Sequence, residues 1–157
     1  MTSIFSFIVK PVGERYNNKV KVADKELIIN TKIESFKSVN NVAEVVALPL
    51  AYSTDVKVGD IVVIHHNVFR VFYDIRGNKK NSRSYFMDDL YFCDIDQIYL
   101  YKNTDKWKAF GDRCFIKPIK NRDYLNVAKE QRLIGILKYG NSSLEALKIN
   151  EGDLVGY

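Results

Sequence analysis

The residue types that could carry catalysis or bind a metal are few in this chain. His65 and His66 are its only histidines. Adjacent residues on a strand point to opposite faces, so this pair could not easily hold one metal ion, and no cysteine or carboxylate cluster accompanies it. Acidic residues at 88–89 and at 94 and 96 lack a recognisable acid–base partner, and no hydrolase, zinc-protease or phosphate-loop motif is present. The sequence therefore predicts a non-enzyme with no catalytic residues, no metal site and no cofactor.

Binding is the remaining chemistry, and a basic stretch is one candidate for it. Residues 77–84 (GNKKNSRS) are typical of a polar hairpin tip. Arg76, Lys79, Lys80 and Arg83 could contact phosphates or an acidic protein surface. The alternative is a solvated tip whose lysines discourage pairing with another sheet edge. The sequence favours the solvated tip.

Aromatic residues at strand spacing are a second candidate. They are Phe69, Tyr73, Tyr85, Phe86, Tyr91, Phe92, Tyr99 and Tyr101. Such rings could stack nucleic-acid bases, as in OB-like barrels, but packing in a core or subunit interface is the favoured interpretation. A basic OB-like nucleic-acid-binding module is thus the weakest functional alternative, and nucleic acid is not the expected partner.

A third candidate is the short apolar run Leu27-Ile28-Ile29, which lies between charged flanks. Three such side chains on the surface could dock on a partner, contributing up to roughly 5–8 kcal/mol before ordering costs. The alternative is an ordinary short strand with Leu27 and Ile29 facing inward. The residues themselves leave both interpretations open.

The composition is that of a folded protein. The 157 residues are 46% hydrophobic and 27% charged, with a net charge of +5 supplied mostly by scattered lysines, which favours a solvated basic surface. Cys93 and Cys114 lie in apolar contexts and are interpreted as two buried thiols in a reducing compartment. No stretch approaches the roughly 20 apolar residues of a membrane span, so we expect a soluble, intracellular protein without membrane contact.

The elements that would position these candidates are predicted to be strands. Apolar runs at 4–9, 42–48 and 61–64 end at Pro11, Pro49 or polar residues. Further strands are predicted at 85–92 and 94–101, with Ile95, Ile98 and Leu100 in the core.

In the stretch 68–75 the residues alternate, and the set Phe69, Val71, Tyr73 and Ile75 is predicted to face the core. Only 142–147 (SSLEAL) could form a short helix. The fold class is therefore all-β.

An internal repeat organises these strands. A turn is predicted at Lys57-Val58-Gly59-Asp60, just before the strand 61–64, because Gly and Asp are typical turn residues. The same pair, Gly152-Asp153, precedes the apolar residues Leu154-Val155. The segment 114–119 (CFIKPI) repeats 8–12 (IVKPV), and 132–137 stands where 42–48 stood. We predict a domain at 1–103, a linker at 104–112, and a shorter, incomplete copy at 113–157.

These motifs resemble the co-chaperonin (GroES, chaperonin-10) family. The stretch Asp55–Val62 (DVKVGDIV) matches the family's signature almost letter for letter, and Ala43–Ala47 (AEVVA) is similar to its G-E-V-x-A strand. Val9-Lys10-Pro11 fits its opening strand, and Leu27-Ile28-Ile29 stands where the family's mobile loop carries a hydrophobic docking tripeptide. The resemblance covers residues 4–102 and, more faintly, 113–157.

The resemblance implies a GroES-like small barrel, followed by a partial second copy, that assembles into a homo-oligomeric ring. It also implies a co-chaperonin role in which Leu27, Ile28 and Ile29 dock on a chaperonin ring and the assembly caps the folding chamber. ATP would be bound by the partner. Relatives of this kind carried by bacteriophages serve capsid-protein folding in the host cytoplasm.

The alternative is a structural or assembly protein of a phage virion that reuses the same barrel and contacts other virion proteins. Three features favour it: the incomplete second copy, the short segment 48–54 in place of the family's roof hairpin, and the absence of glycines beside Leu27–Ile29.

Overall fold

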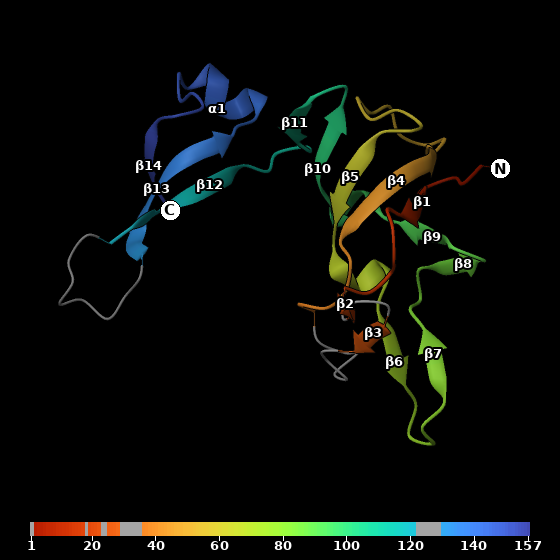
Figure 1. Cartoon of the computed structure of the whole chain (residues 1–157). Helices are drawn as coiled ribbons and strands as arrows, with labels where there is room; N and C mark the ends of the chain where they lie inside the picture. The colour runs from red at the N-terminus through yellow and green to blue at the C-terminus, as the bar shows by residue number, and fades with distance from the viewer. Residues whose placement is uncertain (1, 18, 23–24, 29–35, 122–129) are drawn as a thin grey trace. The chain divides into compact units, whose positions relative to one another are not determined.

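The computed structural model describes residues 2–17, 19–22, 25–28, 36–121 and 130–157, with only the backbone described at 19–22 and 25–28 (Figure 1). The chain divides into two compact units, Met1–Asp105 and Lys106–Tyr157. The predicted linker at 104–112 contains this division and also a strand, β11 (Lys106–Ala109).

The largest sheet has seven strands in the order β11-β10-β5-β4-β1-β9-β8, and all of them except β11 belong to the first unit. Its other strands are β1 (Phe7–Pro11), β4 (Val42–Ala47), β5 (Ile61–Ile64), β8 (Tyr85–Met87), β9 (Leu90–Cys93) and β10 (Ile98–Asn103). Among the described strands this sheet stays open, with β11 and β8 at its edges. The prediction of an all-β fold is confirmed.

Two hairpins and two short 3-10 helices extend from this sheet. The hairpin of β2 (Lys19–Val22) and β3 (Lys25–Ile28) lies between β1 and β4 in the chain, and that of β6 (Val71–Tyr73) and β7 (Lys79–Asn81) lies between β5 and β8 (Figure 1). The 3-10 helices are η1 (His66–Val68) and η2 (Ile95–Gln97).

The second unit contains a three-stranded sheet in the order β12-β13-β14 and one helix. The strands are β12 (Phe115–Lys120), β13 (Glu130–Tyr139) and β14 (Leu154–Gly156), and the helix α1 (Ser142–Ala146) confirms the predicted one. Asn141 begins the helix by accepting a hydrogen bond from the backbone N–H of Leu144 at 2.9 Å. No helix in the described part of the chain is long and apolar enough to cross a membrane.

The predicted repeat reappears as matching hydrogen bonds in the two units. In the first, the N–H of Gly59 donates to the carbonyl of Val45 at 2.8 Å, and the N–H of Val45 donates to the carbonyl of Asp60 at 2.9 Å. In the second, Gly152, Leu137 and Asp153 make the same two bonds at the same distances.

The strand pairings of the two units match as well. Pro11 lies opposite Ala43 in the first unit and Pro118 lies opposite Gly135 in the second. On the next strand, Val62 lies opposite Ala43 and Val155 lies opposite Gly135. The set β1-β4-β5 therefore corresponds to β12-β13-β14 in order, direction and register. The counterpart of 42–47 is 134–139, two residues later than the predicted 132–137.

The core of the first unit follows from alternation along its strands. Ala43, Val45 and Ala47 of β4 are buried, as are Val62 and Ile64 of β5, because successive side chains point to opposite faces. Of the three core residues predicted at 95–100, Ile98 is buried, whereas Ile95 and Leu100 are half-buried.

Several predictions of local structure were wrong. The predicted strand 85–92 is divided by a turn at 88–89 into β8 and β9, and the predicted strand 94–101 begins with η2 before β10. The first strand begins at Phe7, and Ile4 is exposed.

Phe69 and Val71 are buried as predicted, but Tyr73 and Ile75 are exposed. Tyr73 lies in a sheet of only two strands, β6 and β7, and Ile75 lies in the turn after β6. Cys93 is buried whereas Cys114 is exposed, because it precedes β12.

Candidate functional site

The basic stretch predicted from the sequence forms the β6–β7 hairpin. Val71 lies opposite Asn81 and Tyr73 opposite Lys79, so the turn between them comprises residues 74–78. Gly77 has a positive φ of 77°, a conformation that glycine adopts without steric cost. The predicted tip, 77–84, is therefore one strand of the hairpin and its flanks.

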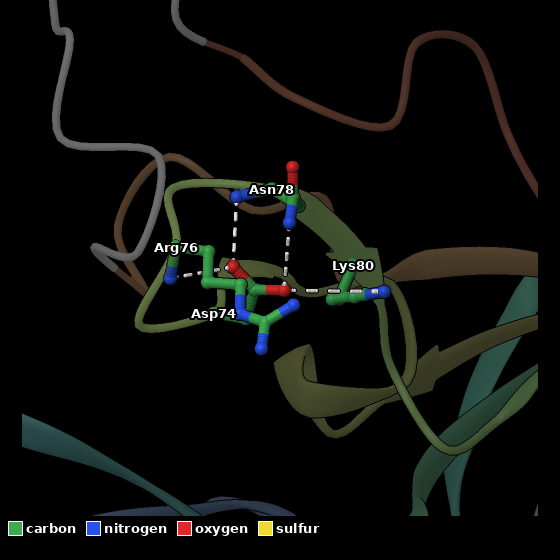
Figure 2. Close-up of polar contacts among 4 residues, drawn as sticks. All are labelled: Asp74, Arg76, Asn78 and Lys80. Carbon is green, nitrogen blue, oxygen red and sulfur yellow. Dashed lines mark hydrogen bonds and ion pairs between the residues drawn. The ribbon is translucent and has the colours of Figure 1, made fainter.

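The side chain of Asp74 holds this turn together (Figure 2). Its Oδ1 accepts hydrogen bonds from the backbone N–H of Arg76 at 2.9 Å and of Asn78 at 2.8 Å, and its Oδ2 accepts one from Nδ2 of Asn78 at 3.1 Å. These bonds, chiefly those from Asn78, lower the pKa of the Asp74 carboxyl. Nζ of Lys80 lies 4.0 Å from Oδ2, an exposed ion pair of small energetic value.

Arg15, which the sequence analysis did not single out, fixes this hairpin to the sheet. Its guanidinium donates through Nε to the carbonyl of Phe69, through Nη2 to the carbonyl of Arg70 at 3.1 Å, and through Nη1 to Oδ1 of Asn81 at 2.8 Å. The guanidinium also lies over the ring of Tyr91, 5.0 Å from its centroid. One side chain thereby joins the residues just before β6 and the last residue of β7 to β9.

Tyr16 supports the same junction. Its hydroxyl oxygen accepts a hydrogen bond from the backbone N–H of Val71 at 2.5 Å, and burial raises the pKa of its phenol. Nearby, the rings of Phe69 and Tyr91 meet edge to face with centroids 4.9 Å apart. The base of the hairpin is therefore packed and hydrogen-bonded, whereas its tip is exposed.

A cavity of about 530 Å³ lies at the base of the hairpin. Its lining includes two arginines, Arg70 and Arg83, and two aromatic residues, Phe72 and Tyr73, and the rest comes from Asn67, Gln97 and two serines. No carboxylate lines it among the described residues. Its volume is in the range of small-molecule sites, and its lining residues are basic, aromatic and neutral polar.

The four predicted contact residues are thus brought onto one hairpin. Arg76, Lys79, Lys80 and Arg83 are all exposed, with Arg76 in the turn and Arg83 at the cavity. The sequence signal that identified them was the run of basic residues. The cavity has no sequence signal of its own, because Asn67 and Gln97 reach it from η1 and η2.

The histidine pair differs from the prediction of opposite faces. The rings of His65 and His66 stack with centroids 4.4 Å apart, because β5 ends at Ile64 and strand alternation no longer applies. Nδ1 of His65 accepts a hydrogen bond from the backbone N–H of Asn67 at 3.1 Å. Burial is the main cause of the lowered pKa of His66. In the described residues no three His, Cys, Asp or Glu side chains gather as a metal site would require.

The aromatic candidates are divided between core and surface. Phe69, Tyr91 and Tyr101 are buried, Phe92 and Tyr99 are half-buried, and Tyr73, Tyr85 and Phe86 are exposed. Core packing therefore describes only part of this set. The exposed members lie on β6 and β8, on either side of the basic strand β7 in the chain.

The apolar run proposed for docking falls partly within the β2–β3 hairpin. Leu27 lies opposite Val20 and Ile28 opposite Lys19 in the backbone register. Ile29 lies outside the described residues. The structure thus places the start of the run on a strand.

Comparison with known proteins adds no relative to this picture: no family model, no curated protein and no solved structure matches the chain.

Proposed function

We propose that this chain is a co-chaperonin-like protein that docks on a chaperonin ring and caps its folding chamber. The observation that carries the proposal is the position of the β2–β3 hairpin between β1 and β4. In the family that the sequence resembles, the docking loop stands at this point, between the opening strand and the strand similar to Ala43–Ala47.

The strands on either side of the hairpin support the same proposal. β1 and β4 pair along their length, and the Gly59-Asp60 turn adds β5 to β4 by backbone hydrogen bonds. A rigid three-stranded frame of this kind would hold the ends of the docking segment close together. Repetition of the frame in a homo-oligomeric ring would turn weak single contacts into high avidity.

The proposed docking residues are Leu27, Ile28 and Ile29. ATP would be bound by the chaperonin, and docking would take place in the cytoplasm of the cell or of the infected host. The client could be a capsid protein, as in phage-carried relatives. This role requires neither a cofactor nor a catalytic residue in the chain.

The test is binding to a chaperonin ring with and without ATP, measured by co-sedimentation or interferometry. The double variant Leu27→Asp/Ile29→Asp should lose nucleotide-dependent binding. The matched control is Ile75→Asp, which places the same charge on an exposed apolar residue of the other hairpin and should bind normally. If the folded parent protein does not bind in either nucleotide state, the co-chaperonin role is wrong.

A second candidate, a structural or virion-assembly subunit, is favoured by one specific observation. In the first unit the outer edge of β1 pairs with β9 and the outer edge of β5 pairs with β10. Their counterparts β12 and β14 pair only with β13 among the described residues. Leu133, Leu154 and Tyr157 in this unit are exposed. Uncovered edges with apolar side chains are suited to pairing with another chain.

Sedimentation of the protein with and without Leu154→Lys tests this candidate. A subunit that assembles through its second unit should fall to a smaller species when the charge is introduced. An unchanged assembly would exclude β14 as the contact. Since Leu154 lies outside the proposed docking residues, this result is independent of the chaperonin test.

A further inference from the structure

The β6–β7 hairpin pairs each exposed ring with a cation on the opposite strand. Phe72 lies directly opposite Lys80, and Tyr73 lies directly opposite Lys79. The rings are 39% and 45% exposed, and both lysines are exposed. Because neighbouring residues on a strand point to opposite faces, each face of the hairpin carries one ring and one lysine.

The cavity at the base of the hairpin continues this pattern. Phe72 and Tyr73 are among its lining residues together with Arg70 and Arg83. The positive charge therefore extends from the cavity to Arg76 in the turn. The acidic side chain of the hairpin, Asp74, accepts hydrogen bonds from Arg76 and Asn78 and lies 4.0 Å from Nζ of Lys80 (Figure 2). That exposed ion pair is weak, so a phosphate can replace the carboxylate as the partner of Lys80.

The hairpin is also held in place before any ligand arrives. The contacts of Arg15 with Phe69, Arg70 and Asn81 fix the base of both strands. The hydroxyl of Ser82 adds a hydrogen bond to the carbonyl of Val68 at 2.6 Å. Since binding costs free energy for every group that must be ordered, a preformed base leaves more of the contact energy as affinity.

We propose that this hairpin and its basal cavity bind single-stranded nucleic acid. One base would stack on Phe72 at the cavity, where Asn67 and Gln97 offer polar groups to its edge. The phosphates that follow would run along Arg83 and Lys80 and then cross the outer edge of β7, which pairs with no other described strand, to Lys79 on the other face. Interleaved rings and cations are the combination that single-strand-binding surfaces use. An acidic polypeptide would use the cations alone and would leave the rings without a partner.

This inference goes beyond the proposed docking role and uses other residues. The docking segment is 27–29, whereas the nucleic-acid surface comprises Phe72, Tyr73, Lys79, Lys80 and Arg83. Each activity can therefore fail by itself. A chaperonin-binding protein with no affinity for nucleic acid would overturn only the present inference.

The test is fluorescence anisotropy with a labelled oligothymidylate of about 12 nucleotides, within the usual range of single-strand sites. Measurements between about 50 and 200 mM salt give the number of phosphates engaged. Contact with about four phosphates predicts a slope of log K against log salt near about −3. Thymidine monophosphate as competitor distinguishes binding of a strand from binding of a free nucleotide, and should compete poorly.

Matched variants locate the surface. Phe72→Leu keeps an apolar side chain but removes the ring, and we expect affinity to fall by about tenfold, in line with the value of one base–aromatic stack. Arg83→Ala should weaken binding and make the salt slope shallower by about one phosphate. Lys57→Ala removes the same charge from an exposed residue at the opposite end of β5 and should change neither property.

Three results would overturn the inference. They are no binding at about 50 mM salt, equal affinity of the Phe72→Leu variant and the parent protein, and displacement of the oligonucleotide by polyglutamate at comparable charge. The last would mean that the surface recognises negative charge on a protein rather than a nucleic-acid strand. Circular dichroism of each variant shows that the fold is kept, as expected for exposed positions.

Discussion

Asp60 and Asp153 occupy equivalent turns in the two units of the chain. The carboxylate of Asp60 accepts a hydrogen bond from the backbone N–H of Lys57 at 2.8 Å, and that of Asp153 accepts one from the N–H of Asn150 at 2.7 Å. Each aspartate also donates its own N–H to the carbonyl of the same residue, Lys57 or Asn150, at 3.1 Å. The same turn precedes β5 in the first unit and β14 in the second. In each case it fixes the register in which that strand pairs with its neighbour.

The glycine before each of these aspartates should be sensitive to substitution. Gly59 has a φ of 90° and Gly152 a φ of 99°, and a Cβ at either position would meet no atom within 4 Å. Gly59→Ala should therefore lower the free energy of unfolding by about 1–2 kcal/mol, entirely through the strained backbone. Urea unfolding followed by circular dichroism measures the change. An alanine as stable as the glycine would contradict the assigned turn conformation.

Gly135 should be sensitive for a different reason. A Cβ there would lie 2.2 Å from Cγ2 of Ile116 and 3.0 Å from the carbonyl oxygen of Lys117, although its counterpart Ala43 carries a methyl group in the first unit. We expect Gly135→Ala to destabilise the second unit by about 1–3 kcal/mol through overpacking. Gly140→Ala is the control, because its Cβ would meet Leu137 only at an ordinary 3.5 Å. Equal stability of the two variants would argue against this close approach of β12 to β13.

Arg15 should contribute to the stability of the hairpin more than its charge suggests. Arg15→Lys keeps the charge, but a single ammonium group cannot donate hydrogen bonds to the carbonyls of Phe69 and Arg70 and to the side-chain amide oxygen of Asn81 at the same time. We expect a loss of about 1.5–3 kcal/mol and faster amide hydrogen exchange in β6 and β7. Arg76→Ala, which removes a cation from the exposed turn, should leave both measurements close to those of the parent. Unchanged exchange in Arg15→Lys would show that the hairpin is held by other contacts.

The two cysteines should differ in reactivity. Burial raises the pKa of the Cys93 thiol far above its usual value, and the thiolate is the reactive species. At pH 8 a thiol reagent should label Cys114 rapidly and Cys93 only after unfolding. Cys114→Ser should abolish the rapid phase. Two equivalents labelled rapidly in the folded parent would mean that β9 is not buried as described.

The carboxyl of Asp74 should titrate at an unusually low pH. Hydrogen bonds from Asn78 and Arg76 favour its charged form in the folded hairpin, so its pKa is lower when folded than when unfolded. Its stabilising effect is therefore present above the unfolded pKa and is lost as the pH falls through the folded one. A carbon-detected NMR titration should show Asn78→Ala moving the pKa upward, with Lys80→Ala moving it less. The reverse order would assign the effect to the ion pair.

The sequence alone determined the strand content, the short helix and the internal repeat. β-branched runs such as Ile61–Ile64 bury side chains by simple alternation, and a Gly-Asp turn has few conformations. The matching hydrogen bonds of Gly59 and Gly152 were thus predictable from the repeated residues. The basic hairpin was also visible, because its cations stand close together in the chain.

Only the tertiary structure decided where that hairpin lies and what forms its base. Arg15 is far from Asn81 in the sequence, and Gln97 is far from Phe72, so no local pattern could place them at one junction or one cavity. The wrong predictions at Tyr73 and Ile75 and for the stacking of His65 on His66 have a related cause. Alternation predicts a buried face only while the strand continues and its sheet packs on a core. Ile75 and the histidines lie beyond the ends of β6 and β5, and Tyr73 lies in a sheet of two strands, β6 and β7.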